Sequence, residues 1–216
     1  MRLRWRFAQF FEFHWWKNYL KAQDTAAYLG WKKRYWEQFL EKGGLFLPPD
    51  AAVLDAGCGP AGIFIALHTR CQVEATDPLL ARYAERLPVF KPAYYPGVRF
   101  FDAPIEHFSP GKQYDFVFCL NAINHVADLS RCFDRLTALT KPGGRLVLSV
   151  DAHNSPFLKY LFQFFPGDIL HPHQYGLQDY VSMLKNRNFQ VERAVLMKKS
   201  GIFNYYLIIA QPGAMG

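Results

Sequence analysis

Three glycines in this chain have the spacing of a loop whose backbone lies against a ligand. In the segment LDAGCGPAG they occupy positions 57, 59 and 62, directly after a short apolar run that predicts a β-strand. Glycines permit the tight turn and the close backbone approach that nucleotide-binding loops need. No Gly-Lys-Ser/Thr sequence follows, so the loop is not a P-loop. Several kinds of nucleotide-binding fold share this spacing, so other residues are needed to identify the ligand.

Two carboxylates beside this loop indicate what it binds. Asp55 ends the predicted strand two residues before Gly57, where it would repel a pyrophosphate but suit a positively charged amine. Asp77 ends the next predicted strand, 22 residues after Asp55, and a carboxylate there accepts hydrogen bonds from ribose hydroxyls in dinucleotide folds. The implied ligand has a ribose, a cationic amine and no phosphate. S-adenosylmethionine fits this description.

The elements that must position these residues alternate between strands and helices. That order predicts an α/β fold with a doubly wound, seven-stranded, mainly parallel sheet, whose last two strands form an antiparallel pair. An aromatic segment at 1–45 is expected to form a helical cap or lid, and residues 46–216 the main domain, with a substrate-cover insertion at about 151–176. The predicted strands are 52–56, 72–77, 98–103, 114–120, 145–150, 189–197 and 203–210, and the predicted helices are two within 1–42, then 60–70, 78–87, 128–139 and about 177–186.

Several motifs in this order resemble the class I S-adenosylmethionine-dependent methyltransferases, in particular the branch that acts on small molecules. They are VLDAGCGPAG, the acid of VEATDP, the acid of FFDAP, YDFVFCLNAINHV and LTKPGGRLVLSV, which together span residues 52–150. The resemblance implies S-adenosylmethionine as cofactor and S-adenosylhomocysteine as product. It also implies that Asp55 and the loop Gly57-Cys58-Gly59 contact the methionine part, Asp77 with Pro78 the ribose, Asp102 with Ala103 the adenine, and Asn121 the methionine end.

The catalytic candidates lie after the fourth predicted strand and before the last helix. His125 follows the fourth strand and is either a general base or a histidine that orients its loop by a hydrogen bond. His173 and Tyr175 resemble a family position that projects into the substrate pocket, with capping or packing as the alternative. Methyl transfer depends mainly on alignment of nucleophile and methyl group, so no catalytic triad is required.

Aromatic side chains near the N-terminus are the candidate substrate contacts. Phe11, Trp15, Trp16 and Tyr19, together with His173, would suit a flat or apolar small molecule such as a quinone or an aromatic metabolite. Ordinary core packing is the alternative for most of these rings. We therefore expect methyl transfer to an O, N or C atom of an apolar or aromatic compound.

Charge and composition restrict the other functions. Nine Lys/Arg and four Asp/Glu in residues 1–42 account for +5 of the net charge of +7. This basic segment could contact an acidic substrate group, a membrane surface or RNA, and a tRNA methyltransferase is an alternative function. A non-catalytic cofactor-binding module is a further alternative. We expect no DNA partner and no metal site. The four cysteines lack metal-ligand spacing and indicate a reducing, cytoplasmic location.

Overall fold

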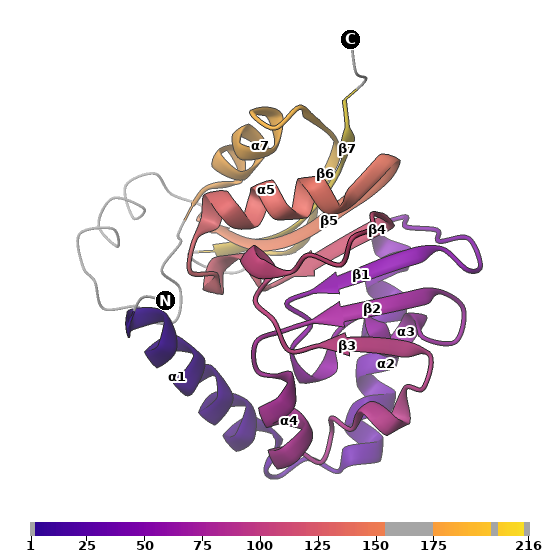
Figure 1. The fold of residues 1–216 in the computed structure, drawn as a ribbon, viewed down its shortest axis with the longest axis vertical. Helices are drawn as coiled ribbons and strands as arrows, with labels where there is room; N and C mark the ends of the chain where they lie inside the picture. Colours follow the sequence, from indigo (N-terminus) through magenta and orange to yellow (C-terminus); the bar gives the residue numbers. More distant parts are fainter. Residues whose placement is uncertain (1–2, 154–174, 200–202, 214–216) are drawn as a thin grey trace.

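The computed structural model describes residues 3–153, 175–199 and 203–213, and a single twisted sheet runs through them (Figure 1). The strand order is β3-β2-β1-β4-β5-β7-β6. All neighbouring pairs from β3 to β5 are parallel, whereas β7 is antiparallel to both β5 and β6. The strands are β1 (Ala52–Ala56), β2 (Gln72–Thr76), β3 (Val98–Phe101), β4 (Tyr114–Leu120), β5 (Thr140–His153), β6 (Phe189–Lys199) and β7 (Phe203–Pro212).

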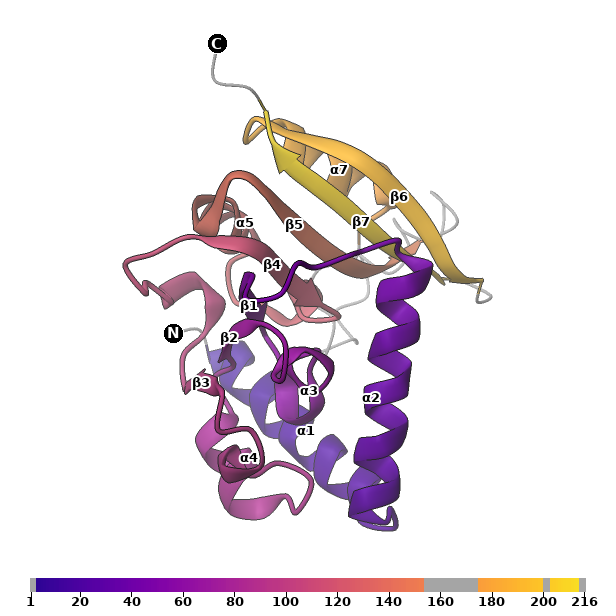
Figure 2. The same cartoon turned by 90° about the vertical axis from the view of Figure 1, so that its right-hand side faces the viewer.

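Helices cover both faces of the sheet (Figure 2). Alternate residues of the central strands point to opposite faces, so Val53 belongs to one buried cluster with α2, α3 and α4, and Leu54 belongs to a second cluster with α5 and α7. The helices are α1 (Leu3–Leu20), α2 (Thr25–Lys42), α3 (Phe64–Leu67), α4 (Leu80–Arg86), α5 (Leu129–Leu139) and α7 (Leu177–Lys185), and short 3-10 turns include η1 (Gly59–Ala61), η3 (Ile105–His107) and η4 (Ile123–His125).

The predicted architecture is confirmed, with corrections at the element ends. The helix predicted at 60–70 is wrong in extent, because its first part is the turn η1 and only Phe64–Leu67 is α-helical. The N–H of Phe64 donates to the carboxylate of Asp55 on β1, and this bond fixes the start of α3 at Phe64. The strand predicted at 145–150 already begins at Thr140, which pairs with Tyr114 before a register shift.

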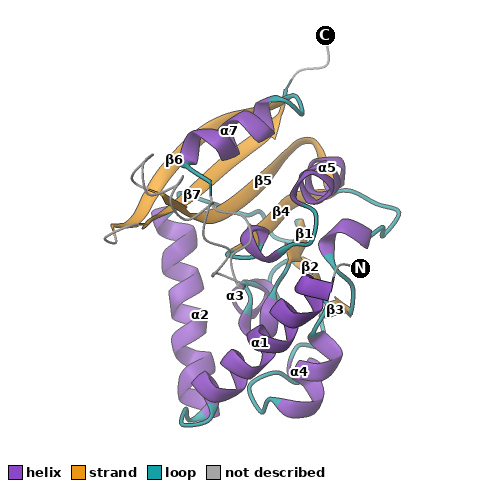
Figure 3. Ribbon diagram, turned by 90° about the vertical axis from the view of Figure 1, so that its left-hand side faces the viewer, coloured by secondary structure: helices purple, strands orange, loops and turns teal. Residues whose placement is uncertain are grey.

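The two N-terminal helices contribute buried side chains to the cluster on the face of the sheet that also carries α3 and α4. Asp24 caps α2 by accepting a hydrogen bond from the N–H of Ala27. Near the middle of α2, the indole N–H of Trp36 donates to the carbonyl of Ala61 at 3.0 Å and fixes the helix to the glycine loop. Figure 3 shows α1 across the near side of the molecule, between α2 and α4. Within the described residues, every helix falls short of the length and apolarity that a membrane span requires.

Candidate active site

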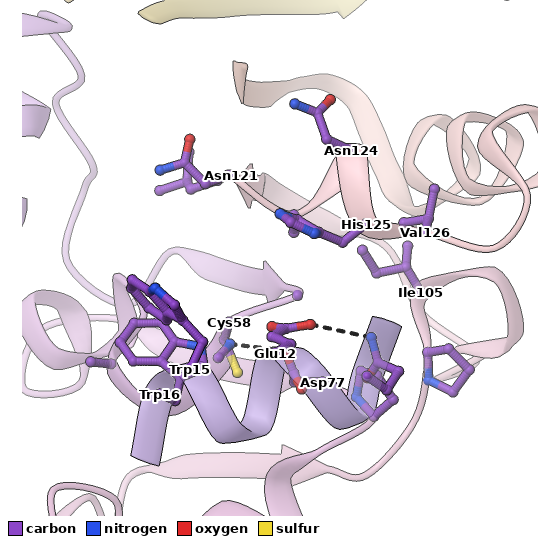
Figure 4. A pocket seen from close by; sticks show the side chains of 18 of the residues that line it. Glu12, Trp15, Trp16, Cys58, Asp77, Ile105, Asn121, Asn124, His125 and Val126 are labelled. Atoms are coloured by element: carbon purple, nitrogen blue, oxygen red, sulfur yellow. Dashed lines mark hydrogen bonds between the residues drawn. The ribbon is translucent and has the colours of Figure 1, made fainter. Parts of the chain in front are cut away.

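A cavity of about 510 Å³ opens at the carboxyl ends of the parallel strands (Figure 4). The strand order reverses between β1 and β4, and a crevice at this position is where open α/β sheets bind ligands. Loops that follow β1 to β4 form one side of the cavity, and α1 and α2 form the other. The residues that line the cavity include Glu12, Trp15, Trp16, Lys32, Trp36, Gly57, Cys58, Gly59, Asp77, Pro78, Ile105, Glu106, Asn121, His125 and Asp151.

The glycine loop lines the cavity with backbone rather than with side chains. The N–H groups of Gly57 and Cys58 both point back to the carbonyl of Thr76, at 2.7 and 3.2 Å. Gly57 has φ +70°, and a Cβ there would lie 2.4 Å from the Cβ of Ala122. At Gly59, φ is +56° and a Cβ would point toward Trp16. The loop therefore favours glycine at both positions, because both have positive φ and a Cβ at Gly57 would also clash with Ala122.

Asp55 lies beneath this loop and is almost fully buried. Its Oδ2 accepts a hydrogen bond from the N–H of Phe64 at 3.0 Å, which satisfies the start of α3. A Cβ on Gly62 would come within 2.3 Å of the same oxygen. Burial raises the pKa of Asp55 to about 7, against the opposing effect of the backbone N–H bonds. Asp55 is not among the cavity-lining residues, so its predicted contact with the methionine part stays a prediction.

Asp77 lines the cavity and also organises the loop. One carboxylate oxygen accepts from the N–H of Gly59 at 3.0 Å, and the other accepts from the N–H of Leu79 at 2.9 Å. Burial raises its pKa to about 6, although these two bonds act in the opposite direction. Each carboxylate oxygen keeps a second lone pair that can accept a ligand hydroxyl. This geometry fits the predicted ribose contact.

Glu12, on α1, brings a further carboxyl group to the cavity and was absent from the predicted site. Tyr83 donates to its Oε1 at 3.4 Å and Gln9 to its Oε2 at 3.2 Å. Burial, followed by the proximity of Asp77, raises the pKa of Glu12 to about 8. Its carboxyl group is therefore mostly protonated at neutral pH, which lets it lie near Asp77 without like-charge repulsion.

Lys32, on α2, is the one Lys or Arg side chain among the described cavity-lining residues. Its Nζ lies over the rings of Trp36, Tyr35 and Trp31, at 4.7, 4.8 and 5.6 Å from their centroids. Burial lowers its pKa to about 8, and the charge of Asp55 partly opposes that shift. Three aromatic faces thus hold a cation at the wall of an otherwise acidic cavity.

The remaining predicted cofactor residues divide into two groups. Pro78, Cys58 and Asn121 line the cavity. Asn121 has φ +55°, and Ser149 donates to its side-chain oxygen at 3.3 Å. Asp102 and Ala103 follow β3 but do not line the cavity, and Asp102 is exposed. In that region the lining comes instead from the next residues, including Ile105 and Glu106, which the sequence reasoning missed.

Some of the predicted catalytic and substrate residues line the cavity, and others do not. His125, on η4, lines the cavity, as do Trp15 and Trp16 on α1 (Figure 4). Phe11 and Tyr19 are exposed and lie outside the lining. Tyr175 packs edge-to-face against Tyr180, with ring centroids 6.0 Å apart, and is also outside it. His173 lies outside the described residues, as does most of the predicted insertion at 151–176.

The residues present fit S-adenosylmethionine. Gly59 lines the cavity and presents backbone without a side chain, Asp77 offers lone pairs to a ribose, and the carboxylates around the cavity favour a cation. Lys32 can meet the carboxylate of an amino acid. Among the described residues, no group of three or more His, Cys, Asp or Glu could hold a metal ion. All four cysteines are buried, free thiols.

The fold and this cavity define a class I S-adenosylmethionine-dependent methyltransferase, as the sequence resemblance implied. A family model described as a methyltransferase domain matches residues 28–194, more than half of the chain. The chain belongs to this methyltransferase-domain family. The predicted family and its cofactor are thereby confirmed.

Curated relatives and solved structures agree with this assignment. A ubiquinone biosynthesis O-methyltransferase of Bradyrhizobium sp. (strain ORS 278) is 30% identical over 99 residues, or 45% of this chain and 38% of that protein. The matched stretch thus spans well under half of the relative. The 1,6-didemethyltoxoflavin-N1-methyltransferase of Burkholderia thailandensis, solved with S-adenosylhomocysteine, superposes with a TM-score of 0.62 at 18% identity, over 98% of this chain and 88% of that one. Magnesium protoporphyrin IX methyltransferase from Synechocystis PCC 6803 gives 0.57 at 20% identity, over 87% and 84%.

The raised pKa of Glu12 predicts a specific dependence of stability on pH. Because the folded state holds the proton more tightly than the unfolded chain, stability should fall as pH rises from about 4.5 to about 8. Glu12→Gln cannot lose a proton and should avoid that loss. Allowing for the partial exposure of Glu12, we expect a gain of about 1–2 kcal/mol at pH 9, or roughly 3–6 °C in Tm, and little difference at pH 4.

Thermal unfolding of both proteins from pH 4 to pH 9 measures this effect. Glu37→Gln is the matched control. Glu37 is half exposed on α2, and its ion pair with Lys33 is long, at 4.0 Å. Wild-type and Glu12→Gln curves that stay parallel across the whole range would show that Glu12 ionises normally.

Proposed function

We propose that this chain transfers a methyl group from S-adenosylmethionine to an oxygen atom of an apolar, aromatic small molecule. The observation that carries the proposal is the composition of the cavity. Its sheet side offers glycine backbone and Asp77, whereas its α1 side offers the indole rings of Trp15 and Trp16. One cavity thus combines polar groups suited to the cofactor with flat apolar surfaces suited to an aromatic acceptor.

The cofactor, when bound, supplies an electrophilic methyl group on a sulfonium. We infer that Asp77 holds the ribose and that the Gly57–Gly59 backbone and Asn121 border the methionine part. Lys32 would pair with the amino-acid carboxylate. Asp55, beneath the loop, is partly ionised at neutral pH because burial raises its pKa to about 7, and its charged fraction favours the amine and the sulfonium. These residues bind and align; the chemistry needs little more than that alignment.

A hydroxyl acceptor must also lose its proton, and His125 is the candidate base. It lies on η4, at the end of β4, and faces the cavity. The relatives named as O-methyltransferases support oxygen as the acceptor atom. A histidine that only orients the η4 turn is the alternative role, and the two roles differ in how activity depends on pH.

Labelled methyl donor, offered with three acceptors in turn, tests the proposal. We expect the full chain to label a prenylated catechol, and to leave an alkylamine and total tRNA unlabelled. His125→Gln should lower catechol labelling at pH 7 by about 100-fold and recover part of it at pH 9, where the catechol ionises by itself, with unchanged affinity for S-adenosylhomocysteine.

Other outcomes assign other functions. Label confined to tRNA would replace the proposal with the RNA methyltransferase reading, and label confined to the amine would move the acceptor atom to nitrogen. Tight S-adenosylhomocysteine binding without transfer to a broad acceptor extract would favour the non-catalytic module. A pH-independent loss in His125→Gln would make His125 a positioning residue.

A further inference from the structure

Five aromatic side chains form an exposed face on α1, here called the outer face: Phe7, Phe10, Phe11, Trp15 and Tyr19. Each is between 41% and 52% exposed. Single exposed rings are ordinary on protein surfaces, but five on one helix form an apolar patch. Residues 7, 11, 15 and 19 follow one another at one-turn spacing, and Trp15 stacks on Tyr19 at 5.1 Å.

Core packing does not account for this face. The helix buries Phe13 and Leu20 on its inner side, and these residues attach it to the domain core. A third side carries Glu12 and Trp16 to the cavity. The outer rings are therefore additional apolar surface that the fold leaves in water, at a cost in free energy that a partner would remove.

The charges around the outer face are positive. Arg6, Lys17 and Lys21 are exposed on or beside α1. The single acidic residue within Leu3–Leu20 is Glu12, whose carboxyl group lies on the cavity side. Aromatic rings flanked by Lys and Arg are the composition of helices that lie in the plane of an anionic membrane surface.

Trp15 connects this face to the cavity, because it is half exposed and also lines the cavity wall. We propose that the outer face of α1 binds an anionic lipid surface and thereby places the mouth of the cavity at that surface. An apolar acceptor dissolved in the lipid then reaches the site without crossing water. Only this delivery role rests on the proposed function; the lipid contact does not.

Other partners agree less well with the charges. A second copy of the chain would bring two positive faces together. RNA would meet the positive rim, but the cavity beside it is lined by Asp77, Glu106 and Asp151, which oppose a polyanion entering the site. An anionic bilayer stays outside the cavity and meets only the rings and the basic side chains.

Flotation of the full chain with phosphatidylcholine vesicles, with and without 30% phosphatidylglycerol, tests the proposal. We expect binding to the anionic vesicles that weakens with salt. Phe7→Gln/Phe10→Gln should weaken it by about 10-fold or more, and Lys17→Gln/Lys21→Gln by about 25-fold. None of these four residues lines the cavity, so affinity for S-adenosylhomocysteine should not change.

Phe46→Gln is the matched control, since Phe46 is 82% exposed and precedes β1, at the opposite edge of the sheet. The proposal is overturned by absence of binding to anionic vesicles, by equal losses in Phe46→Gln, or by a concentration-dependent dimer that buries Trp15 in place of lipid. Salt-sensitive tRNA binding that needs Phe7 and Phe10, with no vesicle binding, would overturn it in favour of RNA. A failure of the methyl-transfer assay alone leaves the lipid contact standing and removes only the delivery role.

Discussion

Asp77→Ala should weaken binding of S-adenosylhomocysteine by about 100-fold or more. The carboxylate lines the cavity, and hydrogen bonds from two ribose hydroxyls to a charged acceptor are worth about 1.5–3 kcal/mol each. The substitution also removes the acceptor for the N–H of Gly59, which positions the loop. Isothermal titration of the full chain measures the effect directly, without relying on methyl transfer.

Two further variants make the result interpretable. Asp77→Asn keeps the shape of the side chain and should bind more weakly than wild type but more tightly than Asp77→Ala, even if the alanine variant folds poorly. Asp115→Ala is the matched control at the other end of the sheet, because Asp115 also accepts a backbone N–H, from Ala52 at 2.8 Å. Unchanged affinity in a folded Asp77→Ala protein would contradict the ribose assignment.

Lys32→Met should weaken S-adenosylhomocysteine binding by about 10- to 100-fold, because a charge-assisted bond to the amino-acid carboxylate is lost in a site with little water. Methionine keeps most of the apolar length that packs against Trp36 and Tyr35. Wild-type affinity should also fall as pH rises through about 8, where Lys32 loses its proton. The variant should lack that pH dependence.

Methylthioadenosine supplies the control ligand, since it has the adenosine and thioether but no amino-acid part. Its affinity should be unchanged in Lys32→Met and strongly reduced in Asp77→Ala. Lys33→Met is the control variant, because Lys33 is the neighbouring lysine, is half exposed and does not line the cavity. Equal losses for both ligands in Lys32→Met would mean that Lys32 supports the structure rather than the carboxylate.

The order of strands and helices was predictable because each element has its own local pattern. Near-continuous apolar runs such as Tyr114–Leu120 indicate buried parallel strands, and the predicted bounds of β4 and of α5, apart from its cap residue Asp128, match the structure. The start of α3 was not predictable, because a hydrogen bond from the N–H of Phe64 to the side chain of Asp55 on β1 decides it. Local sequence patterns do not reveal such tertiary hydrogen-bond partners.

The candidate site likewise has features that the sequence predicts and features that only the tertiary structure sets. By itself the sequence determined the family and the cofactor, and it predicted that the glycine loop and Asp77 lie where the cavity opens, because strand ends and glycines have a fixed position in this class of fold. Only the tertiary structure decided that Lys32, and not Lys33 or Arg34, lines the cavity, and that Glu12 and Trp16 face it while Phe11 and Tyr19 face outward. The physical reason is that these residues lie on helices whose rotation and docking are set by distant contacts, such as the bond from Trp36 to Ala61.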